Sequence, residues 1–149
     1  MKKLIGVVVL FIGLSVSAQT TSDIYQTTDG AIKGYDAVAY FTQNKAIKGT
    51  KQFAVTYKGA DWHFSSAENK EAFQKNPAKY EPQYGGYCAY GCSQGHKAKT
   101  EADAFTIVDG KLYLNYNLDV RKLWSKDQPG YIKQANTNWT KIKDSEFEN

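Results

Sequence analysis

The sequence predicts an α+β protein, a small single domain with two antiparallel hairpins and three to four short helices. The strands are predicted by two pairs of apolar runs, each pair separated by turn-forming residues: 53–57 with 62–64, and 105–108 with 111–116. The helices are predicted by start and stop signals that follow each hairpin. The chain has 149 residues, which is the usual size of one domain with a real core.

The two hairpins have different signals. Residues 53–57 alternate apolar with small or polar side chains, the period-two pattern of a half-buried strand, and residues 58–61 then form a turn. In the second hairpin, Asp109-Gly110 stands between two apolar runs and predicts a type I′ turn. Both segments are therefore expected to fold back on themselves as antiparallel pairs.

A helix is expected directly after the first hairpin. Ser65 and Glu68 have the spacing of a capping box, in which the serine caps the helix and the glutamate reaches back to the cap amide. The helix should run to about Lys75, because Pro77 disfavours a helical conformation in the residue before it. Phe73 is its expected inward residue.

Two further helices are expected after the second hairpin. The first contains Leu118, Leu123 and Trp124, which indicate a short amphipathic helix. The second follows Pro129-Gly130, a helix-start signal, and has four apolar residues at helical spacing: Tyr131, Ile132, Ala135 and Trp139.

The N-terminus has the pattern of an export signal. Lys2 and Lys3 precede an apolar run of about 13 residues, and Val16-Ser17-Ala18 supplies the small residues of a cleavage site. The run is too short to span a bilayer as a helix, which needs about 20 residues; the alternative is a short membrane anchor. We predict a cleaved signal peptide at 1–18 and a periplasmic or secreted protein with no membrane span in its mature form.

The remaining chain divides into three parts: an N-terminal tail at 19–30, one domain at 31–142 and a frayed C-terminal tail at 143–149. Loss of residues 1–18 would leave 131 residues and lower the net charge from +4 to +2. This balance argues against nucleic acid or an anionic membrane as a partner. A phosphate-binding loop, a nucleophile elbow and paired carboxylates are all absent from the sequence, so we predict no enzyme.

Both cysteines and one of two histidines lie within nine residues. Cys88, Cys92 and His96 are spaced at four and four, and soft thiolates with an imidazole suit copper(I) or zinc. In a straight helix Cys88 and His96 would be about 12 Å apart along the axis, too far to share one ion. All three could converge only where the chain bends, at Gly91 or Gly95.

Three other interpretations of this segment stay open. Cys88 can be a buried small hydrophobe. Cys88 and Cys92 can form a short, strained disulfide in an oxidising compartment. His96 can be a solvated loop residue. A thiol-redox enzyme is a further hypothesis, with His96 and Lys97 as the nearest cations, but the usual C-x-x-C spacing is absent.

Several aromatic and single polar residues also invite a functional interpretation. Tyr84, Tyr87 and Tyr90 could form a ligand-stacking wall, although core packing is the ordinary use of such tyrosines. His63 alternates with Trp62 and Phe64 and so faces away from them, which favours a structural or surface role over ligation.

Five runs of this sequence resemble the YHS domain family, and in particular its small exported bacterial members. The resemblance covers about residues 30–140 and rests on residues 34–41, 64–73, 76–80, 84–89 and 107–115. The resemblance implies the compact fold of that family, whose activity is less settled than its fold and motifs.

The resemblance also implies a role with metals. Some YHS domains accompany heavy-metal transporters and are thought to bind copper or related ions through cysteines. At the three corresponding cysteine positions this sequence has Ala39, Ser65 and Asn69. The family's own metal site is therefore expected to be absent, and any metal would need Cys88, Cys92 and His96.

Two functions follow as hypotheses. The first is an exported soft-metal protein that holds copper or zinc through Cys88, Cys92 and His96 for trafficking or detoxification. The alternative is a non-catalytic binding or interaction module with structural cysteines and no metal, which would use Tyr84, Tyr87 and Tyr90. The sequence names no protein partner and no oligomeric state.

Overall fold

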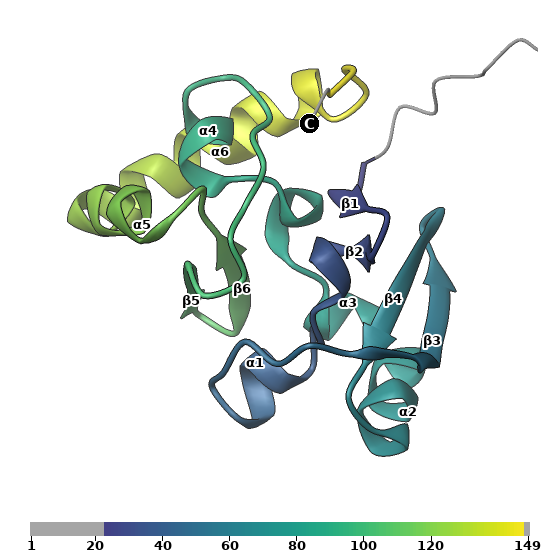
Figure 1. Ribbon diagram of the computed structural model, residues 1–149. Helices are drawn as coiled ribbons and strands as arrows, with labels where there is room; N and C mark the ends of the chain where they lie inside the picture. Colours follow the sequence, from purple (N-terminus) through teal and green to yellow (C-terminus); the bar gives the residue numbers. More distant parts are fainter. Residues whose placement is uncertain (1–22, 148–149) are drawn as a thin grey trace, which may run out of the picture.

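The computed structural model describes residues 23–147. Within this range the chain forms three two-stranded antiparallel sheets, six α-helices and three short 3-10 helices in one small domain (Figure 1), which confirms the α+β class. The predicted signal peptide, residues 1–18, lies outside the described residues. No described helix is both long enough and apolar enough to cross a membrane.

The strands form three hairpins, and both predicted hairpins are among them: β1 (Gln26–Thr27) with β2 (Gly30–Ala31), β3 (Thr50–Tyr57) with β4 (Ala60–Phe64), and β5 (Phe105–Val108) with β6 (Lys111–Leu114). Asp109 and Gly110 have φ angles of 51° and 72°, as a type I′ turn requires. The β1–β2 hairpin was not predicted, because two-residue strands have no period to detect.

The helices include the three that the sequence predicts and three shorter ones: α1 (Ala39–Thr42), α2 (Ala67–Lys75), α3 (Pro77–Tyr80), α4 (Ala89–Ser93), α5 (Leu118–Trp124) and α6 (Gln128–Ile142). The 3-10 helices are η1 (Ile32–Gly34), η2 (Gln83–Gly86) and η3 (Ser125–Asp127). The unpredicted α1, α3 and α4 are single turns of four or five residues. Such turns depend on tertiary contacts, since isolated helices this short are unstable.

The start of α2 differs from the prediction by one residue. Its N-cap is Ser66, whose Oγ accepts a hydrogen bond of 3.1 Å from the backbone N–H of Asn69. Ser65 instead donates its hydroxyl to Asp36, at 2.6 Å. The predicted capping box with Ser65 as the cap is therefore wrong. The predicted end at Lys75 and the burial of Phe73 are confirmed.

The buried side chains form two cores. The first core lies around β3, β4 and α2, and its largest members are Tyr40, Trp62, Phe64, Phe73, Leu112 and Leu114. The second core lies around α4, α5 and α6, and its members are Tyr25, Tyr84, Tyr87, Ala89, Cys92, Tyr113, Trp124 and Ala135. Figure 1 shows the two groups of elements on opposite sides of the molecule, with the β5–β6 hairpin reaching between them.

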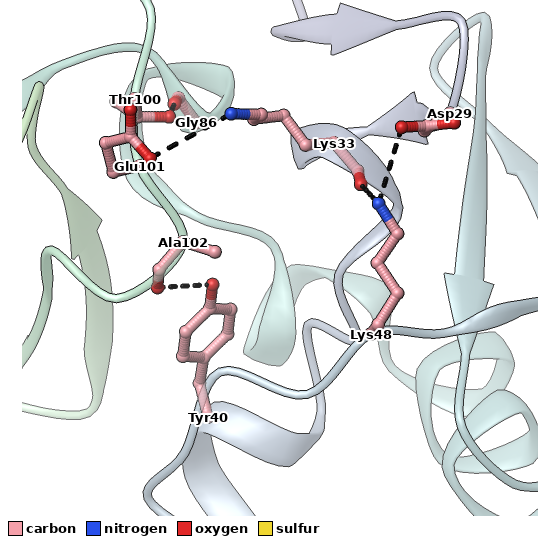
Figure 2. Close-up of polar contacts among 8 residues, drawn as sticks. All are labelled: Asp29, Lys33, Tyr40, Lys48, Gly86, Thr100, Glu101 and Ala102. Carbon is pink, nitrogen blue, oxygen red and sulfur yellow. Dashed lines mark hydrogen bonds and ion pairs between the residues drawn. The ribbon is translucent and has the colours of Figure 1, made fainter.

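The loop after α4 ties the two halves together (Figure 2). The Tyr40 hydroxyl donates a 2.8 Å hydrogen bond to the carbonyl oxygen of Ala102, and Lys33 lies 3.9 Å from the Glu101 carboxylate. Thr100 in the same loop donates to the Gly86 carbonyl at 2.8 Å. These contacts hold the N-terminal third of the fold against the segment that carries the cysteines.

The chain ends differ from the expected tails at 19–30 and 143–149. Ile24 and Tyr25 are buried, one in each core. At the other end, the Phe147 ring lies 6.1 Å from that of Tyr25. Lys97 donates to the carbonyl oxygens of Lys143 and Ser145, at 2.5 and 2.7 Å. Both ends therefore contribute single residues to the cores, Ile24 and Tyr25 at one end and Phe147 at the other.

Candidate functional site

Cys88 is the N-cap of α4. Its sulfur accepts hydrogen bonds from the backbone N–H groups of Gly91, at 3.4 Å, and Tyr116, at 3.2 Å. Its S–H donates to the Asn115 side-chain oxygen at 3.5 Å. The residue is buried, and burial raises the pKa of the thiol above its ordinary value despite these donors. Cys88 thereby joins α4 to the end of the second predicted hairpin.

Cys92 lies one helical turn later and points into the second core. Its side chain is fully buried among residues that include Trp124 and Ala135. Burial, followed by the nearby Cys88, raises the pKa of the Cys92 thiol to about 12. Lys97 opposes this shift, but its effect is smaller than that of burial. Since metals and oxidants react with the thiolate, burial keeps Cys92 in its unreactive form.

His96 does not join the two cysteines. The chain turns at Gly95, which has a φ of 90°, and the His96 backbone N–H returns to the Gly91 carbonyl at 3.1 Å. The residue is exposed, whereas both cysteines are buried. Both cysteines are free thiols. Among residues 23–147, no group of three or more His, Cys, Asp or Glu side chains is placed to hold a metal ion.

The three candidate tyrosines face different environments. Tyr84 and Tyr87 are buried in the second core, and burial raises the pKa of both, that of Tyr87 to about 12. Tyr90 is half-buried, with its ring 5.3 Å from that of Tyr131 in an edge-on contact. Tyr84 and Tyr87 both pack against Trp139 inside the second core, whereas Tyr90 packs at its edge against Tyr131.

Tyr84 also borders a pocket of about 330 Å³ between η2 and α6. Its hydroxyl donates to the Asn136 side-chain oxygen at 2.9 Å, and its ring lies 6.0 Å from that of Trp139. Lys58 and Glu81, which line the same pocket, form an ion pair of 3.1 Å. At this pocket the Tyr84 hydroxyl is thus paired with Asn136, and Lys58 is paired with Glu81.

A buried carboxylate forms the polar centre of the first core. Asp36 is fully buried, and its Oδ1 accepts from the backbone N–H groups of Val38, at 2.9 Å, and Ala39, at 3.1 Å. Its Oδ2 accepts three more hydrogen bonds: from the Ser65 backbone N–H at 2.8 Å, the Ser65 hydroxyl at 2.6 Å and the Asn69 side-chain amide at 2.8 Å. The five donors place α1 and the start of α2 around one charge.

The positions that correspond to the family's cysteines all meet at this carboxylate. Ala39, Ser65 and Asn69 each donate a hydrogen bond to Asp36. Ala39 reaches Asp36 through its backbone N–H, whereas Ser65 and Asn69 reach it with their side chains. In this chain the three positions supply N–H and O–H donors to an anion that already accepts five bonds, so the residues present do not fit a soft metal ion.

Comparison with protein-family models gives one match. Residues 38–84 match the model of the YHS domain, a family associated with metal handling, and this match confirms the resemblance for that stretch. The matched stretch contains Ala39, Ser65 and Asn69 and ends before Cys88. Comparison with curated proteins finds no match. Comparison with solved structures finds none either.

Asp36 is the residue that sequence reasoning missed. An aspartate two residues before a helical turn is a common local cap, and Asp36 precedes α1 in this way, which is a signal that could have found it. Its second oxygen could not have been assigned, since Ser65 and Asn69 are 29 and 33 residues away.

Proposed function

We propose that this protein is an exported, non-catalytic binding module built on a YHS domain, and that it acts without a thiol-bound metal ion. The observation that carries the proposal is the structural use of the candidate ligands. Cys88 caps a helix, Cys92 fills the second core, and the three positions matched to family cysteines donate to Asp36. Withdrawing Cys88 or the donors to Asp36 for a ligand would leave buried partners unsatisfied, and withdrawing Cys92 would leave a gap in the second core.

Export rests on the first eighteen residues, which combine two lysines, an apolar run and a small-residue cleavage site. In an oxidising compartment an exposed thiol pair would oxidise readily, whereas buried, un-ionised thiols resist oxidation. The burial of Cys88 and Cys92 is thus compatible with a periplasmic or secreted protein that keeps both cysteines reduced.

A second candidate is the soft-metal function, with copper(I) or zinc held by Cys88 and Cys92 together with His96. One observation favours it: both cysteines are free, and they lie one turn apart, with the Cys92 N–H bonded to the Cys88 carbonyl at 2.9 Å. This site would require α4 to leave the second core, so that both thiols could ionise and His96 could approach.

A metal titration of the reduced protein separates the two candidates. Copper(I) and zinc are added in turn to the wild type and to Cys88→Ser and Cys92→Ser variants, in competition with a chelator. The binding module takes up no stoichiometric metal through its thiols, so the three proteins give the same titration. One ion per chain, lost in both variants, would establish the soft-metal function instead.

A further inference from the structure

A second pocket, of about 460 Å³, lies beside the face of β4 that points away from the first core. Its polar lining comes from three places: the β1–β2 hairpin, β3 and β4. The side chains that matter are Gln26, Thr28, Lys51, Asp61 and His63. Asp61 and His63 are two residues apart on β4, so they lie on the same face of the strand.

His63 is only 8 % exposed, yet its ring lines this pocket. Two glycines let the chain approach the imidazole: a Cβ on Gly30 would lie 3.3 Å from Nε2, and one on Gly34 would lie 3.3 Å from Nδ1. Both glycines have positive φ angles, and the residue opposite His63 in the register is the small Ala54. The backbone at Gly30 and Gly34 therefore packs close to the two ring nitrogens, and the part of the ring that stays accessible lines the pocket.

Neither ring nitrogen of His63 has a hydrogen-bond partner within residues 23–147. Neither nitrogen is among the fully buried side-chain atoms that lack a partner, so both keep some accessible surface at the pocket. An unsatisfied imidazole that lines a pocket is a group available to a ligand, and it can donate from one nitrogen and accept at the other.

Two opposite charges border the same pocket without pairing. In the described chain Lys51 has no ion pair, and the Asp61 carboxylate accepts one hydrogen bond, from the Thr56 hydroxyl at 2.8 Å. The strand register shifts between Thr50 and Ala54, and Lys51 lies inside this irregular stretch of β3. In the pocket at Tyr84, by contrast, Lys58 and Glu81 neutralise each other.

We propose that the His63 pocket binds a small zwitterion of the amino-acid class. The Lys51 ammonium and a ring nitrogen of His63 hold the carboxylate, and Asp61 holds the ammonium group. An anion alone would be repelled by the Asp61 carboxylate, and a cation alone would be repelled by the Lys51 ammonium. A zwitterion pairs with both groups. This inference rests on the proposed binding function and assigns it a site and a ligand class.

The test is a titration followed by the NMR signals of the His63 ring and the pocket backbone. L-Alanine, L-leucine, L-glutamine and L-phenylalanine are added separately to the purified protein, and acetate and methylammonium serve as probes with one charge each. At least one amino acid should give saturable shifts centred on residues 26–30 and 61–63. Acetate and methylammonium should each bind at least about tenfold more weakly than that amino acid. Each lacks one of the two charged groups and so loses a charge-assisted contact.

Substitutions refine the assignment. Lys51→Gln, Asp61→Asn and His63→Gln should each weaken the amino acid about tenfold or more. Lys111→Gln removes a matched exposed strand lysine outside the pocket and should leave binding unchanged. Signals far from the pocket show whether each variant keeps its fold.

Several results would overturn the inference: no saturable shift with any of the four amino acids, acetate binding as tightly as an amino acid, or shifts centred on Tyr84, Asn136 and Trp139. Equal effects of Lys51→Gln and Lys111→Gln would do the same. None of these results changes the expected outcome of the metal titration. Thiol-dependent metal uptake alone would not shift the NMR signals of the His63 ring. The failures of the two proposals are therefore distinguishable.

Discussion

The two cores of this protein enclose polar centres of different kinds. In the first, a charged carboxylate, Asp36, accepts five hydrogen bonds from α1 and the start of α2. In the second, the centre is neutral: Asn115 accepts from the Tyr90 N–H at 3.0 Å and from the Cys88 thiol at 3.5 Å. Within the described chain the Asn115 Nδ2 has no partner, so this centre is less completely satisfied.

The comparison shows how the possible metal ligands of this chain are used. The region that matches the YHS model has donors to a carboxylate at the positions of the family's cysteines. The region beyond the match has thiols, but one caps a helix and the other is packed in a core. In both regions the residues at these positions make contacts within the fold.

The largest expected effect is in the first core. Asp36→Asn removes the charge and turns an NH₂ group toward donors from Ser65 and Asn69 or from α1, so at least two donors lose their acceptor. Since hydrogen bonds to a charged group contribute about 1.5–3 kcal/mol each, we expect a loss of about 3 kcal/mol or more. Urea denaturation measures it, with the exposed Asp61→Asn as a control that changes little.

A similar loss of stability is expected on substitution of Gly85, which lies in η2. A Cβ on Gly85 would lie 1.6 Å from the Asp23 carbonyl oxygen, and Gly85 has a φ of 61°. Gly85→Ala should therefore cost about 3 kcal/mol. Gly110→Ala is the matched control: its φ is 72° but nothing lies within 4 Å of the new Cβ, so it should cost about 1 kcal/mol. Equal losses in thermal unfolding would show that residue 23 does not pack against Gly85.

The two cysteines should respond differently to the same change. Cys92→Ser places a hydroxyl in the apolar second core and should cost about 2 kcal/mol. Cys88→Ser replaces one helix cap by another that serine makes well, and should cost less than about 1 kcal/mol. Denaturation under reducing conditions measures both, and the reverse order would contradict the assigned roles.

At neutral pH the burial of the Cys92 thiol has no visible pH dependence, and its effect appears only at alkaline pH. The raised pKa of Cys92, about 12 against an ordinary 9.0, stabilises the fold fully below pH 9, and this contribution is lost as the pH rises toward 12. Cys92→Ala lacks it, so its free energy of unfolding should fall less steeply above pH 9, by up to about 1.4 kcal/mol per pH unit. Parallel curves for the wild type and the variant would mean that Cys92 is not buried as described.

Local signals predicted much of the fold. Asp109-Gly110 fixed its hairpin, because the turn depends on the two residues themselves, and Pro77 marked the end of α2. The β1–β2 hairpin and the burial of Ile24 had no such signal, since they depend on contacts with distant residues. The cap of α2 was misassigned for the same reason: Ser65 is taken by Asp36 from another element.

The candidate site was predicted less well than the fold. The spacing of Cys88, Cys92 and His96 placed the cysteines one turn apart, as they are, but it carries no information on burial. The turn at Gly95 leads His96 to the surface, away from the thiols. His63 was interpreted as structural or surface, and only the tertiary fold reveals its pocket.

The most direct test of the central claim is the reactivity of the two thiols in the folded protein. Iodoacetamide alkylation is followed across a range of urea concentrations, with each cysteine quantified by mass spectrometry. If both thiols are structural, they react only through global unfolding, and the opening free energy from labelling equals the free energy of unfolding. Labelling of either cysteine in the native state at the rate of a free thiol would contradict this account and favour a site that opens to metal.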